Sequence, residues 1–121
     1  MADDARTPKA NRADDVQVLA LAEAQLAALG TDFDQPALQD LRSVADSYPD
    51  DGHDGAGEVA ASLCRLLDNL IAAGRLDREA LRVHVRAWRF MVTAKPDAAA
   101  RAAVLEGLSA VADLYADAKA A

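Results

Sequence analysis

The sequence is poor in the residues that build sheets, disulfides and membrane spans. Aromatic residues make up 4% of the chain, and the only cysteine is Cys64. A lone cysteine excludes an intramolecular disulfide and a cysteine-rich zinc site, so we expect Cys64 to be a small core residue. Charged residues interrupt the apolar runs before they reach the roughly 18 residues that a membrane span needs. The N-terminal segment lacks the apolar stretch of a secretory signal.

Acidic residues outnumber basic ones. Thirteen Lys and Arg stand against twenty Asp and Glu, which gives a formal net charge of −7. Phosphate backbones and anionic lipids repel such a chain, so we expect neither nucleic acid nor a membrane as its partner. Its 121 residues suffice for one domain with a modest core. Alanine and leucine dominate the apolar fraction and favour closely packed helices, so we expect a cytoplasmic, all-α protein.

Apolar residues recur at three- and four-residue spacing in five segments separated by turn residues. We predict a disordered tail over 1–13 and one domain over 14–118, folded as an antiparallel bundle of four to five helices. The core is expected from the first, third, fourth and fifth helices, with Asn69 of the third facing outward. The expected helix caps and stops are Asp14 or Asp15, Gly30, Thr31 or Asp34, Gly74 and Asp77. Asp97 is expected in the first turn of the fifth helix, where its charge favours the positive end of the helix dipole.

The predicted fourth helix, 77–94, has one broad apolar face. Its apolar arc covers more than half of the helix circumference, so we expect this helix to be the most buried of the set. His84 falls inside the arc and is expected to be a hydrogen-bonded core residue. The arc consists of Ala80, Leu81, Val83, His84, Val85, Ala87, Trp88, Phe90, Met91 and Val92.

The remaining arc of the same helix carries a row of arginines. The segment 75–95 has a local net charge of +4 from six basic and two acidic residues, whereas 32–58 has −7 from eight acidic residues and one arginine. Two interpretations remain open. The row is either a solvated face paired with acids of the second helix, or a docking strip for an acidic partner. Its members are Arg78, Arg82, Arg86 and Arg89.

The segment 49–57 is the only long loop that the sequence predicts, and it contains the second histidine, His53. Asp50, Asp54 and Gly55 match positions 1, 5 and 6 of a calcium loop, but Ala61 stands where a bidentate glutamate is needed. The chain has no glycine-rich phosphate loop, nucleophile elbow or paired-histidine zinc motif. We therefore expect no metal, no cofactor and no enzyme active site.

The segment EVAASLCRLLD, 58–68, resembles the helix that follows the phosphorylation site in bacterial histidine-phosphotransfer (Hpt) domain proteins. The similarity extends to 22–33, 81–92 and 104–108. Hpt domains are helical bundles that carry a phosphoryl group on a histidine and exchange it with receiver-domain aspartates. The resemblance therefore implies a helical bundle that acts in two-component signalling.

The phosphorylation motif of this family has the pattern H-D-L-K-G. The segment 53–57 keeps its histidine, aspartate and final glycine, with Ala56 in place of the lysine. A second alignment places Asp46 at the histidine position. The resemblance makes His53 the remnant phospho-acceptor and His84 the runner-up, and it leaves phosphotransfer itself open.

Two functions follow from the sequence as expectations. The first is a cytoplasmic Hpt-like protein that binds a response-regulator receiver domain, with the arginine row as the partner-binding surface. The alternative is a helical interaction or dimerisation scaffold without a phosphorelay role. The chain is expected to be a monomer or a homodimer.

Overall fold

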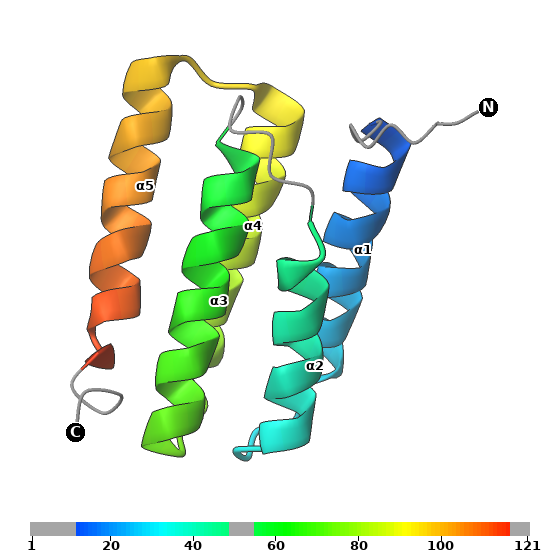
Figure 1. Cartoon of the computed structure of the whole chain (residues 1–121), viewed down its shortest axis with the longest axis vertical. Coiled ribbons are helices and arrows are strands. Elements are labelled where there is room, and N and C mark those ends of the chain that lie inside the picture. The colour runs from blue at the N-terminus through cyan, green and yellow to red at the C-terminus, as the bar shows by residue number, and fades with distance from the viewer. Residues whose placement is uncertain (1–11, 49–54, 117–121) are drawn as a thin grey trace.

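The structure, a computed structural model, describes residues 12–48 and 55–116, and these form five helices and no strand. Successive helices run in opposite directions, and α3 lies between α2 and α5 with α4 behind it (Figure 1). The predicted all-α antiparallel bundle is confirmed. The helices are α1 (Arg12–Ala28), α2 (Gln35–Asp46), α3 (Ala56–Ala73), α4 (Arg78–Ala94) and α5 (Ala98–Asp113).

The first four helices form a ring in which each packs on two others. Both α1 and α3 contact α2 and α4, and α5 packs outside the ring against α3 and α4. Both α3 and α4 touch three helices, but α3 has ten buried residues, whereas α4 has seven. The prediction that the helix over 77–94 is the most buried is therefore wrong. It failed because α5 packs more extensively on α3 than on α4.

Aspartate side chains fix the starts of three helices. Asp34, Asp77 and Asp97 each accept a hydrogen bond from the backbone N–H three residues further on, at 3.2, 3.0 and 2.9 Å. Such caps satisfy N–H groups that the helix itself leaves without acceptors. Gly74 ends α3 with a φ of 67°, which a glycine adopts without steric cost. α1 begins at Arg12, inside the segment 1–13 that was predicted to be a tail.

The inner face of α2 consists of Leu38, Leu41, Ala45 and the following Tyr48, which are all buried. The core differs from the prediction in its composition. It draws more on α2 than on α5, because α5 buries only two residues, Leu108 and Ala112.

Three side chains lie differently from the prediction. Asn69 was expected on the surface but is buried, and its Nδ2 donates to the carbonyl oxygen of Ala112 at 2.9 Å. That carbonyl belongs to the last turn of α5, where the helix leaves acceptors open. Val83 and Phe90 were expected to widen the buried face of α4, yet they are 37% and 40% exposed. Neither is covered because α5 and α1 occupy only the flanks of α4.

Polar contacts dock α5 onto the ring. Arg65 Nη2 donates to Ser109 Oγ at 3.0 Å, and the Tyr115 hydroxyl donates to Asp77 Oδ2 at 2.7 Å. The guanidinium carbon of Arg75 lies 5.3 Å from the centre of the Tyr115 ring. These contacts fix the register of a helix that contributes little buried apolar surface.

Truncating the core should destabilise the protein strongly. Leu63 and Trp88 are both 0% exposed, so we expect Leu63→Ala or Trp88→Ala to lower the free energy of unfolding by roughly 2–5 kcal/mol. Urea denaturation measures the change. Leu114→Ala is the matched control, because Leu114 is 70% exposed and should cost less than about 0.5 kcal/mol. Equal costs for Leu63→Ala and Leu114→Ala would contradict the packing.

Candidate functional site

The proposed phospho-acceptor His53 lies outside the described residues, together with Asp50 and Asp54 of the calcium-like pattern. Gly55, which is described, has a φ of 84° and precedes the first turn of α3. Within 12–48 and 55–116, no group of three or more His, Cys, Asp or Glu side chains is placed to hold a metal ion.

His84 is buried between α3 and α4, as its position in the apolar arc predicts. It is 0% exposed, and its Nδ1 lies 3.1 Å from the Ala80 carbonyl oxygen. A carbonyl only accepts, so Nδ1 carries the proton and Nε2 accepts from the Ser62 hydroxyl, 2.9 Å away. Burial lowers the pKa of His84, and the charge of Arg65 lowers it further. Phosphoryl transfer to either ring nitrogen would require the contact between α3 and α4 to open.

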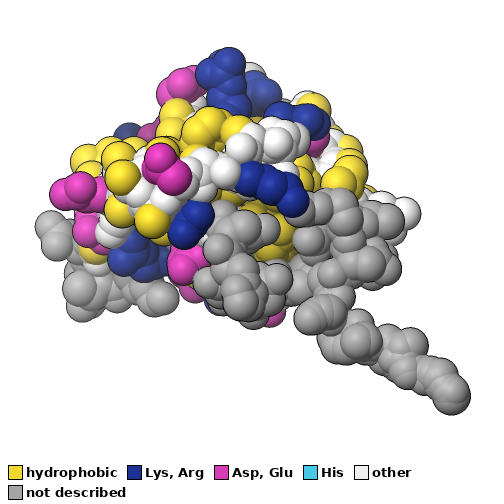
Figure 2. Space-filling view, turned by 90° about the horizontal axis from the view of Figure 1, so that it is seen from above, with side chains coloured by type: hydrophobic (Ala, Val, Ile, Leu, Met, Phe, Trp, Pro, Cys, Tyr) yellow, Lys and Arg dark blue, Asp and Glu magenta, His cyan; other side chains and the backbone are white. Residues whose placement is uncertain are grey.

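The four arginines lie together on the outer side of α4 and are all exposed. At about 100° per residue they span an arc of roughly 80°, with Phe90 and Val83 next to it on one side. Seen from above, Lys and Arg side chains stand at the top of the view and also near its centre and lower left, beside hydrophobic surface (Figure 2). We call Arg78, Arg82, Arg86 and Arg89, with Val83 and Phe90, the α4 face.

The ion pairs of the α4 face differ from those expected. Arg89 pairs with Glu23 of α1, with Nε 2.7 Å from Oε2 and Nη2 2.8 Å from Oε1, and not with an acid of α2. The Glu23 carboxylate raises the pKa of Arg89. Arg82 has only a loose 3.5 Å contact, to Glu79 in its own helix. The other two arginines of the face, Arg78 and Arg86, form no ion pair with any residue that the structure describes.

α2 itself contributes an arginine, Arg42, to an ion pair with an acidic residue of α3. Its Nε lies 2.7 Å from Asp68 Oδ1 of α3, and the two side chains are 36% and 28% exposed. This ion pair joins α2 to α3. The acidic residues of α2 do not reach the α4 face, because α2 and α4 are not neighbours in the ring.

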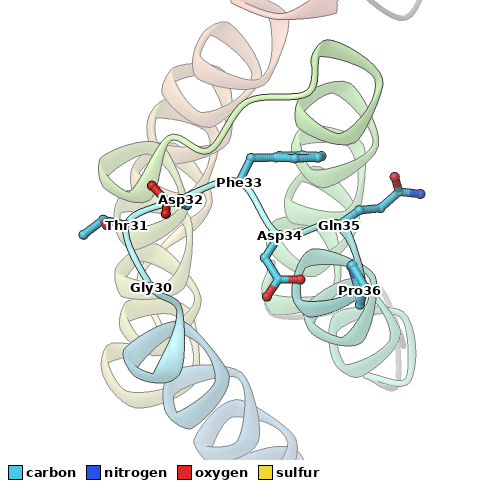
Figure 3. Close-up of a pocket in the computed structure, with 7 residues that line it drawn as sticks. All are labelled: Gly30, Thr31, Asp32, Phe33, Asp34, Gln35 and Pro36. Atoms are coloured by element: carbon cyan, nitrogen blue, oxygen red, sulfur yellow. The ribbon is translucent and has the colours of Figure 1, made fainter.

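No residue of the α4 face lines the hollows found among the described residues. One hollow of about 580 Å³ lies in the loop between α1 and α2, where the side chains diverge and do not face a common point (Figure 3). A smaller one of about 210 Å³ between α2 and α3 is lined mainly by alanine and glycine, with Cys64 and Asp46. Cys64 is 8% exposed, as predicted for a core residue, and burial raises the pKa of its thiol.

No protein-family model, curated protein or solved structure matches this chain. The fold and site define a class only, an all-α bundle with a basic outer face on its fourth helix. Every helix in the described ranges is too short or too polar to cross a bilayer.

Protonation of His84 should destabilise the fold. Because the pKa of His84 is lowered on folding, the unfolded chain binds a proton first as pH falls below the ordinary value of 6.5. The free energy of unfolding should therefore be highest above that pH and decline below it. Urea denaturation between pH 5 and 8 measures this decline.

Two histidine variants separate the sources of this pH dependence. His84→Gln should remove the decline between pH 7 and 5, whereas His53→Gln should retain it. An unchanged decline in His84→Gln would show that another group is responsible.

Proposed function

We propose that this protein is an interaction module that binds an acidic protein partner through the α4 face. The observation that carries the proposal is the exposed row of four arginines beside two exposed apolar side chains. Arginine and aromatic residues are enriched where proteins bind one another, since both combine apolar area with directional contacts. Among the described residues, no carboxylate forms a hydrogen bond with the guanidinium group of Arg82 or Arg86, so both groups can bind a partner.

The charge of the whole molecule favours a protein over other polyanions. Its net charge of −7 repels long phosphate polymers and anionic bilayers at distance. A protein with a compact acidic patch feels mainly the local positive field of α4, because salt screens charges more than about 8–10 Å away.

The partner that the sequence resemblance favours is a response-regulator receiver domain. Receiver domains present an acidic pocket, and the helical bundle observed here is compatible with the Hpt-like expectation. The proposal concerns binding and requires no phosphorylated histidine. It also assigns the contact to α4 and not to the segment around His53, which the resemblance marks as the phospho-acceptor region.

A second candidate function, a dimerisation scaffold, is favoured by the outer face of α1. Val16 and Leu21 are 48% and 54% exposed there, and Ala20, Ala24 and Ala27 are exposed beside them. Such a face fits a second copy of the same chain. Analytical ultracentrifugation of the wild type and of Leu21→Glu distinguishes the two functions. A dimer that the substitution dissociates supports the scaffold, and a monomer in both cases rejects it.

Neutralising the α4 face should weaken receiver binding. We expect Arg82→Gln/Arg86→Gln to bind receiver domains about tenfold more weakly, or about 1.4 kcal/mol, mainly because association slows. Surface plasmon resonance against a panel of receiver domains at low and moderate salt gives both rates. Added salt should weaken wild-type binding in the same way.

The matched control is Ala103→Glu/Ala110→Glu, which changes the net charge by the same −2 on the exposed outer side of α5. It should bind nearly as the wild type does. If both double variants weaken binding equally, net charge rather than the α4 face is responsible. If the wild type binds no receiver domain, the partner is wrong.

A further inference from the structure

Glu23 occupies an unusual place at the border of the α4 face. It is the only charged residue between Val16 and Ala28, so the last turns of α1 are otherwise uncharged. At helical spacing, Glu23 lies at the border between the exposed outer face of α1, which includes Val16 and Ala27, and the side of α1 that packs on α4. Glu23, the one acidic residue of this segment, therefore lies beside the arginine row of α4.

The contact that Glu23 makes is the tightest of the α4 face. Both carboxylate oxygens are used, at 2.7 and 2.8 Å, and they occupy the Nε–Nη2 edge of the Arg89 guanidinium. This edge is one that a partner carboxylate would need for a two-point contact. The pair remains accessible, because the side chains of Arg89 and Glu23 are 57% and 31% exposed.

We infer that Glu23 is an intramolecular competitor that keeps Arg89 from binding the acidic partner and so limits the affinity of the α4 face. This inference rests on the proposed function. A carboxylate of the partner that approaches the Nε–Nη2 edge of Arg89 must first displace Glu23, whereas one that approaches Arg82 or Arg86 displaces no hydrogen-bonded group. The acidic pocket of a receiver domain therefore binds Arg82 and Arg86, while Arg89 remains paired with Glu23.

The energetics favour competition over a role in folding. An exposed ion pair contributes little to stability, because water already solvates both charges. The negative charge of Glu23 nevertheless lies within a few ångströms of the basic row, where it reduces the local field that steers an acidic partner. Removing it should therefore change binding more than it changes unfolding.

A thermodynamic cycle tests the inference with receiver domains as the probe. Glu23→Gln should bind about two- to fivefold more tightly than the wild type, with faster association. Arg89→Gln alone should change the affinity less than twofold, since Arg89 is already neutralised. In the Glu23→Gln background, Arg89→Gln should abolish the gain.

The matched control is Glu79→Gln, which removes one negative charge next to Arg82, where the contact is only a loose 3.5 Å. Its gain should be smaller than that of Glu23→Gln. Equal gains, or no gain in Glu23→Gln, would overturn the inference while Arg82→Gln/Arg86→Gln still weakens binding. If that double variant binds as the wild type does, the proposed function itself fails.

Discussion

The packing of α3 against three other helices is the constraint on which the rest of the structure depends. Its apolar side chains face α2, α4 and α5, so those helices must each turn an apolar face toward it. The polar residues that α3 carries inward then need partners, which explains why Asn69 binds an end carbonyl of α5 and Ser62 binds His84. Burying these groups without partners would cost about 1–3 kcal/mol each.

The functional surface follows from the same constraint. Because α4 turns its apolar face to the ring and has α5 along one flank, only one arc of it remains in solvent. The arginines occupy this arc, and α1 supplies its other border through Glu23. Positive charge is thus concentrated on one side of a protein whose total charge is negative. The acids of α2 do not cancel it, since α2 lies across the ring from α4 and pairs with α3 through Arg42 and Asp68.

Much of the fold was predictable from the sequence because short-range interactions determine where the helices begin, where they end and which face is apolar. Aspartate caps, Gly74 and the three- and four-residue spacing of leucines act within one or two helical turns, and the predicted helices and their inner faces largely agree with the structure. The errors concern contacts between distant segments. A helical wheel shows that α3 has a wide apolar arc, but not that α5 covers part of it, and so Asn69 was placed outside.

The candidate site was predictable to the same degree. The arginine row was visible because it repeats along one helix, whereas the partner of Arg89 was not, since Glu23 lies 66 residues away. One signal could have indicated Glu23, namely its position as a lone charge in an otherwise uncharged segment. The burial of His84 was predictable from the wheel, while its bond to Ser62 depends on how α3 and α4 are aligned.

The most direct test of the α4 face is an NMR titration of the ¹⁵N-labelled protein with an unlabelled receiver domain, following backbone amides and arginine Nε–H groups together. The account predicts that shift changes concentrate on α4, with the Nε–H groups of Arg82 and Arg86 changing most and that of Arg89 changing less. Shift changes centred on α2 and the start of α3, with the α4 resonances unmoved, would contradict it.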